Sequence, residues 1–155
     1  MTQTEFTNLI ATITGRIEGR PLDAALKTHL NATFPAQGET YRAVLDGCRD
    51  GIAAGWMCSR EHAGIKYGRV VKPGPVTSGF SVDVVEMDSV AGGHHRHPHG
   101  EIDMIMPIDA SARFDGRGAG WLVYGPDTAH VPTVAGGKAL VLYLLPEGAI
   151  EFTKA

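Results

Sequence analysis

The sequence predicts a mainly β fold that carries an α-helical extension at its amino-terminal end. Its 155 residues, 43% of them hydrophobic, suit one compact globular unit with a sizeable core. Apolar residues recur at spacings of three and four through residues 1–60, which is typical of amphipathic helices. Short β-rich runs separated by Gly and Pro fill residues 61–155, which is typical of an all-β sandwich or small barrel. We therefore expect a helical extension over 1–60 and a β-barrel domain over 61–155, joined as one structural unit.

Three helices are expected in the extension. The first begins with a capping-box pattern formed by Thr2 and Glu5, and its apolar face is Phe6, Leu9, Ile10, Ile13 and Ile17. The second is expected to start at Pro21, because proline suits the first turn of a helix. The third runs over 39–54, with Gly55 as its terminator. Short helices are marginal alone, so their apolar faces should pack on the outside of the barrel or in a subunit interface.

The β-rich part contains five clear strand candidates. They cover residues 65–71, 79–87, 102–108, 121–124 and 139–145. Edge strands and apolar helix faces both favour pairing between copies of the chain. We therefore expect a homo-oligomer, and specifically a dimer.

Composition and charge exclude several classes of partner. The formal net charge of −3 is spread without blocks of like charge, which excludes a general attraction to nucleic acid or to an anionic membrane. No apolar stretch reaches the roughly 18 residues that cross a bilayer, and the first residues lack a signal-peptide layout, so a cytoplasmic location is expected. Cys48 and Cys58 are expected to be reduced, buried thiols.

Residues 94–103 hold four of the seven histidines and two carboxylates. His95, His97, Glu101 and Asp103 share odd parity, and side chains on an extended strand alternate between its two faces. If residues 98–100 join two short strands, these groups converge inside a sheet. Imidazole and carboxylate ligands suit a divalent ion such as Fe, Mn, Zn, Ni or Co, and the absence of cysteine here argues against a structural zinc site. The pattern therefore predicts a catalytic metal site with open coordination positions.

A further ligand should come from a distant strand that lies beside this segment, and His130 is the natural candidate because prolines bracket it in a short strand. The spacing of His95, His97 and Glu101 resembles the first motif of the cupin superfamily, and residues 125–130 loosely resemble the second. The sequence departs from the cupin pattern at Ile108 and Asp127, where glycine is usual. The resemblance implies a cupin-like β-barrel, or double-stranded β-helix, whose metal ligands are His95, His97, Glu101 and His130.

Other readings of these polar residues remain open. The histidine run can be a solvated loop that binds metal only adventitiously, and His94 and His99 are more typical of surface or supporting residues than of ligands. Asp103 can act as a general acid or base, or it can orient a ligand histidine.

An anionic substrate also needs a fixed cation. Strands or their flanks supply Lys66, Arg69, Arg96 and Arg113, of which arginine is the better carboxylate clamp. We take Arg69, Arg113 and Tyr124 as the candidate substrate-binding residues. Tyr124 and Tyr143 either line the cavity or fill it.

A closer resemblance rests on four segments, residues 79–87, 92–107, 120–132 and 143–148, behind a helical amino-terminal third. Together they look like the 4-hydroxylaminobenzoate lyase family. That resemblance implies conversion of 4-hydroxylaminobenzoate, a small aromatic acid, to 3,4-dihydroxybenzoate (protocatechuate) and ammonia in the degradation of nitroaromatic acids. Glu101 and Asp103 would then be the catalytic carboxylates, and the metal would serve as a Lewis acid.

Three other functions fit the same residues. A metal-dependent cupin dioxygenase would use the same ligands but would consume oxygen. A cupin-type isomerase acting on a small carboxylic substrate would be distinguished only by substrate screening. A non-catalytic cupin would bind a small ligand without forming product, and the helical part lacks the basic face of a nucleic-acid-binding module.

Overall fold

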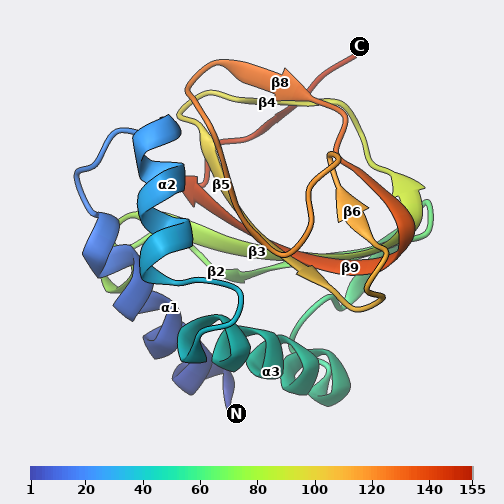
Figure 1. The fold of residues 1–155 in the computed structure, drawn as a ribbon, viewed down its shortest axis with the longest axis horizontal. Coiled ribbons are helices and arrows are strands. Elements are labelled where there is room, and N and C mark those ends of the chain that lie inside the picture. The colour runs from blue at the N-terminus through green and yellow to red at the C-terminus, as the bar shows by residue number, and fades with distance from the viewer. Residues whose placement is uncertain (155) are drawn as a thin grey trace.

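The computed structural model describes residues 1–154, in which three helices cover one side of a large antiparallel sheet (Figure 1). The helices are α1 (Gln3–Ile17), α2 (Ala24–Thr33) and α3 (Glu39–Ala54). The large sheet contains β1 (Arg60–His62), β2 (Ile65–Val71), β3 (Phe80–Ala91), β5 (Glu101–Pro107), β6 (Arg113–Phe114), β7 (Gly120–Tyr124) and β9 (Thr133–Pro146). The small sheet contains β4 (His95–His97), β8 (Thr128–His130) and β10 (Glu151–Phe152). A short 3₁₀ helix, η1 (Pro75–Thr77), precedes β3.

The two sheets face each other and enclose the space into which His95, His97, Glu101 and His130 point. The large sheet has the order β1-β2-β3-β9-β5-β7, with β6 on β9, and the small sheet has the order β10-β4-β8. Figure 1 shows β4 and β8 lying across the open side of the curved sheet formed by β3, β9 and β5. The prediction of a mainly β, cupin-like fold with a helical amino-terminal extension is confirmed, as an open jelly roll rather than a closed barrel.

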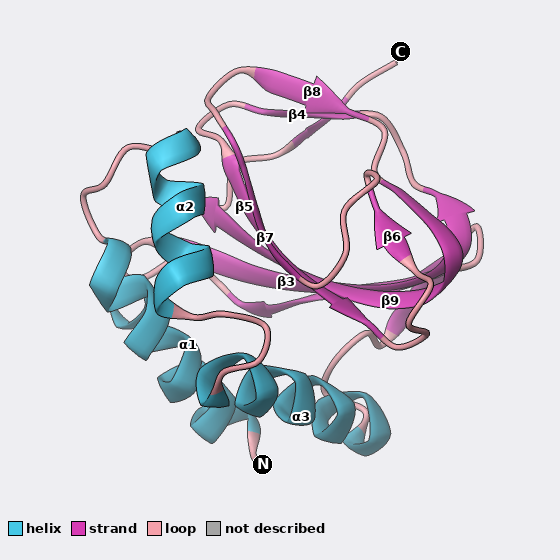
Figure 2. Cartoon of the chain, viewed as in Figure 1, coloured by secondary structure: helices cyan, strands magenta, loops and turns pink. Residues whose placement is uncertain are grey.

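The helices pack on the outer face of the large sheet, as Figure 2 shows with helices in cyan and strands in magenta. Phe6 and Ile10 of α1 share one apolar cluster with Val82 and Met104 of the sheet. Trp121 of β7 donates its indole N–H to the carbonyl oxygen of Phe34 over 2.9 Å, which ties the end of α2 to the sheet. The apolar helix faces are therefore covered within one chain, and dimer formation stays a prediction. The division at residue 60 also stays a prediction, because helices and strands share this core.

The helix ends follow local capping chemistry. Thr2 and Glu5 form the predicted capping box, with Glu5 N–H donating to Thr2 Oγ1 over 3.1 Å. The third helix ends at Gly55 in the left-handed conformation with a φ of 86°, as predicted. The predicted start of the second helix at Pro21 is wrong: the carboxylate of Asp23 accepts the backbone N–H of Leu26 and starts the helix at Ala24.

The longest strands exceed their predicted bounds. β9 begins at Thr133 rather than at residue 139, because Gly136 and Gly137 interrupt the apolar pattern without ending the strand. Both cysteines are free and buried, as predicted. Within residues 1–154, no helix has the length and apolar character needed to span a bilayer.

Candidate metal centre and adjoining cavity

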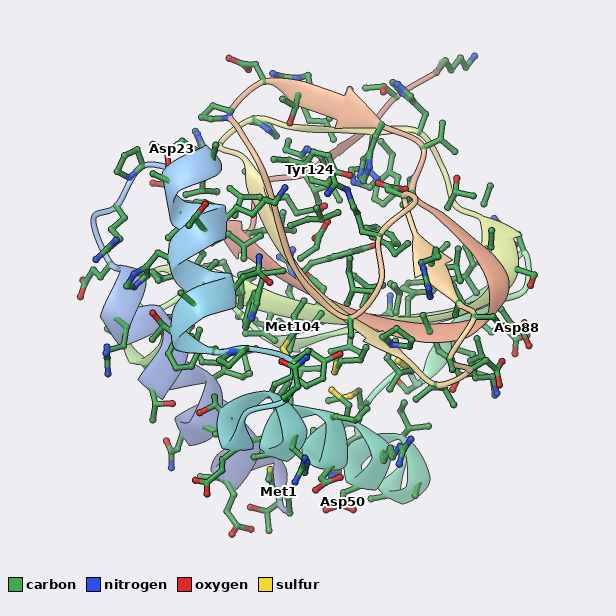
Figure 3. The ribbon with its side chains drawn as sticks, in the orientation of Figure 1. Met1, Asp23, Asp50, Asp88, Met104 and Tyr124 are labelled. Carbon is green, nitrogen blue, oxygen red and sulfur yellow. The ribbon has the colours of Figure 1, made fainter. Side chains whose placement is uncertain are left out.

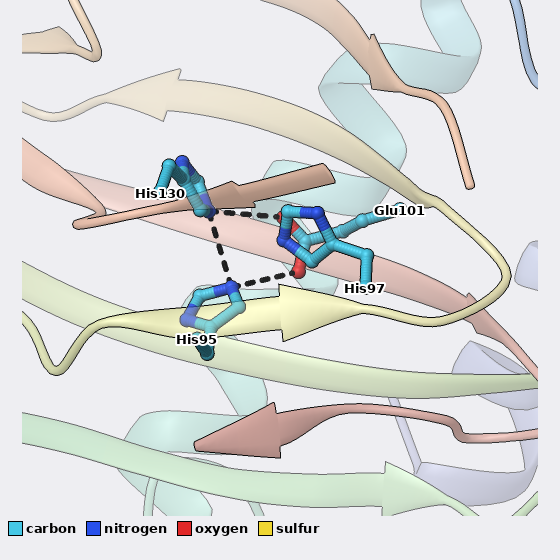
Figure 4. Close-up of side chains that lie close together, drawn as sticks. All are labelled: His95, His97, Glu101 and His130. Carbon is cyan, nitrogen blue, oxygen red and sulfur yellow. Dashed lines mark hydrogen bonds and ion pairs between the residues drawn. The ribbon is translucent and has the colours of Figure 1, made fainter. Parts of the chain in front are cut away.

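Three histidines and one glutamate converge between the two sheets (Figure 4). β4 pairs with β8 so that His95 is directly opposite His130, and the tight turn after β4 brings Glu101 back beside them. One ligand atom from each of His95, His97, Glu101 and His130 lies within 4.8 Å of the others. Glu101 Oε1 is 3.4 Å from His95 Nε2, and Glu101 Oε2 is 3.3 Å from His97 Nε2. The side chains of His95, His97 and Glu101, which share odd parity, therefore point into one space from two facing sheets.

A glycine sets the return of the chain from His97 to Glu101. Gly100 has a φ of +88°, in the left-handed region that favours glycine. A Cβ there would lie 2.7 Å from both Leu22 Cδ2 and the carbonyl oxygen of Tyr124. The turn thus needs glycine for its backbone angle and for the close approach of β7.

Each histidine is held through its Nδ1 atom. His95 Nδ1 is 3.3 Å from the carbonyl oxygen of Gly93, and His130 Nδ1 is 2.7 Å from Oδ2 of Asp115. His97 Nδ1 is 3.0 Å from Thr128 Oγ1, whose own hydroxyl donates to the carbonyl oxygen of Gly125 over 2.7 Å. These acceptors favour a proton on every Nδ1 atom. The three Nε2 lone pairs then point into the centre of the cluster.

The unpaired atoms at the centre fit a bound cation. His97 Nε2 and both carboxylate oxygens of Glu101 are sealed from solvent and lack a hydrogen-bond partner in the described chain. His95 Nε2 and His130 Nε2 are only 3.1 Å apart, and with both Nδ1 atoms protonated their lone pairs repel. A divalent ion held by nitrogen and carboxylate oxygen satisfies all of these atoms at once.

The pKa values of three carboxylates in or near the cluster are shifted in different directions. Burial raises the pKa of Glu101, but without a metal the imidazoles of His95 and His97 act as hydrogen-bond donors to it, outweigh burial and hold its pKa below the usual range. Asp103, the next residue on the same face of β5, is fully buried, and burial together with Glu101 raises its pKa well above the usual value. Burial also raises the pKa of Asp115, but hydrogen bonds from His130 and Tyr124 lower it overall.

The turn before His130 tolerates its departure from the cupin pattern. Asp127 occupies the left-handed region with a φ of 64°, which aspartate adopts more readily than most residues. Its backbone N–H donates to the carbonyl oxygen of His97 over 2.8 Å, and its carboxylate pairs with Arg96. An aspartate here therefore keeps β8 in register with β4.

A cavity of about 720 Å³ adjoins the cluster. His95 and Tyr143 line it on the side of the cluster, and apolar residues such as Val85 and Met87 form much of its wall. Its far side, formed by β1, β2 and the segment after β2, carries the cations Arg60, Arg69 and Lys72. One end of the cavity thus lies beside the histidine cluster, and the other, basic end carries the cations.

The predicted substrate-binding residues lie in three different settings. Arg69 lines the cavity, but Asp83 already accepts its Nε and Nη2 donors over 3.0 and 3.2 Å. Arg113 is exposed on β6, donates to the carbonyl oxygens of Ala110 and Ala112, and is not among the residues that line the cavity.

Tyr124 lies beside the cluster rather than in the cavity wall. Its ring centroid is 4.6 Å from that of His130, and its hydroxyl donates to Asp115. Figure 3 shows its side chain in the space between the two sheets.

The remaining candidates are occupied elsewhere. Lys66 pairs with Glu86 at 3.8 Å, and Arg96 pairs with Glu151 at 3.1 Å. His94 contacts Thr153 Oγ1, and the exposed His99 faces Glu147 at 3.4 Å. Neither histidine belongs to the converging set.

Sequence reasoning missed two residues that hold histidines of the cluster, Asp115 and Thr128. Asp115 follows a two-residue strand and precedes Gly116, so its only sequence signal is that of a turn. Thr128 sits two residues before His130 and pairs across the sheet with His97, a register that only the fold reveals.

Comparison with known proteins finds bacterial relatives with similar sequences. A protein-family model described as 4-hydroxylaminobenzoate lyase matches residues 8–152. The chain is 30% identical to a Pseudomonas putida protein named 4-hydroxylaminobenzoate lyase, over 96% of this chain and 94% of that protein. It is 32% identical to a protein of the same name from Nocardioides sp. (strain LMS-CY), over 88% of this chain and 86% of that protein.

Solved structures similar to this chain include a cupin protein and an oxalate oxidase. An RmlC-like cupin protein from Ralstonia eutropha has a TM-score of 0.46 and 13% identity, covering 62% of this chain and 64% of that one. A structure of oxalate oxidase with glycolate also has a TM-score of 0.46, with 19% identity, covering 61% of this chain and 58% of that one.

Proposed function

The chain belongs to the 4-hydroxylaminobenzoate lyase family, and from this premise we propose that it converts 4-hydroxylaminobenzoate to 3,4-dihydroxybenzoate and ammonia. The reaction adds one water and releases ammonia, so it needs no external oxidant: the N–O bond is reduced while the ring carbons are oxidised. Such a carbon–nitrogen lyase needs a site that polarises the N-bound oxygen and moves protons.

The observation that carries this proposal is the convergence of three imidazole Nε2 atoms and the Glu101 carboxylate beside a cavity large enough to admit a small aromatic acid. His95, His97, Glu101 and His130 would hold a divalent ion there. When bound, the ion supplies a Lewis acid and a source of activated water. Fe, Mn, Zn, Ni and Co all accept this donor set.

Asp103 is the proposed proton carrier. Its two carboxylate oxygens are fully buried and lack a hydrogen-bond partner within the described residues, and it shares a face of β5 with Glu101. A neutral Asp103 donates a proton to the N-bound oxygen as the N–O bond breaks, and the resulting carboxylate takes a proton from the incoming water. Glu101, held between imidazoles, remains ionised and orients that water.

The basic end of the cavity would hold the carboxylate of the substrate. Arg60, Arg69 and Lys72 line it, and the apolar wall between them and His95 suits a flat aromatic ring. The substrate carboxylate then points toward β1 and β2, and the nitrogen-bearing end points toward the histidines. Arg69 is the best placed of the predicted clamps, because its Nη1 atom makes no hydrogen bond within the described residues.

Anaerobic turnover tests the proposal. Metal-loaded protein should convert 4-hydroxylaminobenzoate to equal amounts of 3,4-dihydroxybenzoate and ammonia without oxygen, and His97→Ala should form neither. Product that appears only with oxygen uptake would favour a dioxygenase instead. Absence of product despite bound metal would reject the lyase.

A further inference from the structure

Tyr143 occupies the point where the cavity meets the metal centre. It lies on β9, directly opposite Asp83 of β3 on one side and Asp103 of β5 on the other. Arg69 of β2 lies opposite Asp83, so one row of side chains crosses the inner face of the sheet from the basic end of the cavity to the metal centre. Tyr143 is the central member of this row.

The ring of Tyr143 is fixed by its neighbours. The residue is only 6% exposed, and its ring centroid lies 6.5 Å from that of His95 and 6.4 Å from that of Phe114. It nevertheless lines the cavity. Its position is therefore set before any ligand binds.

The Tyr143 hydroxyl differs from those of the other tyrosines with buried or half-buried rings. Tyr41 donates to the carbonyl oxygen of Ile105, and Tyr124 donates to Asp115, each over 2.5 Å. No hydrogen bond to Tyr143 is found among residues 1–154, although buried tyrosine hydroxyls usually have a partner. The hydroxyl is not sealed from solvent and the residue lines the cavity, so we take the hydroxyl to face that cavity.

The acidic side chains on either side of Tyr143 restrict what it binds. Asp83 and Asp103 are its cross-strand neighbours, so a substrate carboxylate placed there would have two acidic side chains beside it, whereas Arg60, Arg69 and Lys72 line the other end of the cavity. A neutral acceptor needs no such cation. The carboxylate of an aromatic acid therefore belongs at the basic end, and its neutral polar substituent belongs at Tyr143.

We propose that Tyr143 is a substrate-binding residue whose hydroxyl donates a hydrogen bond to the N-bound oxygen on the ring of an aromatic carboxylic acid. This inference rests on the proposed function, and it adds the residue that recognises the nitrogen–oxygen group. It also explains how the cavity distinguishes a ring that bears an N–O group from one that does not.

Binding of two unreactive acids to the metal-loaded protein tests the inference. 4-Nitrobenzoate carries N-bound oxygens and benzoate carries none. Tyr143→Phe should weaken 4-nitrobenzoate binding by between about three- and tenfold, the worth of one neutral hydrogen bond. The same variant should bind benzoate as the unsubstituted protein does, and it should retain full metal content. Isothermal titration calorimetry measures both acids.

Tyr41→Phe is the matched control, because Tyr41 lies in α3 and its hydroxyl has a structural partner. It should lower the thermal unfolding midpoint without changing the ratio of the two affinities. If Tyr143→Phe lost affinity equally for both acids, or for neither, the proposed role of Tyr143 would be overturned. That outcome would not contradict the proposed lyase reaction. A selective loss without any turnover of 4-hydroxylaminobenzoate would support the Tyr143 contact and reject the proposed reaction. An unsubstituted protein that bound neither acid would reject both.

Discussion

His130 Nδ1 lies 2.7 Å from the Oδ2 atom of Asp115, although the two residues are 15 positions apart in the sequence. Asp115 Oδ1 also accepts the backbone N–H of Thr133 over 2.9 Å, so the carboxylate is fixed from both sides. The contact places the proton of His130 on Nδ1 and leaves Nε2 free to coordinate. The geometry of the proposed metal site thus depends on a residue outside the histidine motif.

Asp115→Asn should weaken metal binding by about 10- to 100-fold, the usual effect of losing a carboxylate behind a ligand histidine. The amide can present N–H to His130 and so favour the wrong tautomer. Competition with a metal-sensitive chelator measures the change. Asp88→Asn, an exposed acid near the far end of β3, should bind metal normally. Similar losses in both variants would show that general charge, rather than the His130 contact, controls affinity.

Bound metal should stabilise the fold. At roughly a hundredfold excess of free metal over its Kd, binding stabilises the folded state by about 2.7 kcal/mol. Thermal unfolding with and without chelator measures this shift. His97→Ala should abolish it and His99→Ala should keep it, because His97 is in the cluster and His99 is half-exposed outside it. A shift lost in His99→Ala would mean that His99 replaces one of the four proposed ligands.

Two opposite substitutions test the basic end of the cavity. Arg69→Gln should raise KM by about tenfold or more, since a charge-assisted hydrogen bond to the substrate carboxylate is lost. Asp83→Asn should lower KM, because it frees Arg69 from its competing partner. Steady-state kinetics with 4-hydroxylaminobenzoate measures both. Arg113→Gln separates the two predicted clamps: a larger KM effect there than in Arg69→Gln would place the carboxylate elsewhere.

Gly100→Ala should destabilise the protein by about 3 kcal/mol, through an unfavourable backbone angle and a close contact with neighbouring atoms. Gly19→Ala is the matched control: its φ of +77° imposes a similar backbone cost, but no atom lies within 4 Å of the added Cβ. Its cost should be about 1 kcal/mol. Urea unfolding compares the two. Equal costs would show that the approach of Leu22 and Tyr124 to Gly100 is readily relaxed.

The convergence of these residues was largely predictable, because their spacing follows a short-range rule. His95, His97 and Glu101 share parity on strands joined by a glycine turn, and His130 stands alone in a short strand bracketed by prolines. Local patterns of this kind involve residues that lie close together in the sequence. The same is true of the capping box of α1 and of Gly55 at the end of α3.

The rest depends on registers between distant strands. Asp115 reaches His130 only because β6 and β9 pair, and Tyr143 meets Asp83 and Asp103 only through the alignment of three strands. The sequence made Tyr124 a substrate-binding candidate and left Tyr143 as a residue that either lines or fills the cavity. Their hydroxyl partners distinguish them, and those partners depend on the three-dimensional fold.

The most direct test of the central claim is the dependence of turnover on bound metal. Metal-free protein should be titrated anaerobically with each candidate ion while 3,4-dihydroxybenzoate formation and bound metal are measured together. Activity should rise in proportion to occupancy and reach its maximum at one ion per chain, and His97→Ala should show neither binding nor turnover. Full activity in metal-free protein would contradict the claim that the histidine–glutamate cluster acts through a metal.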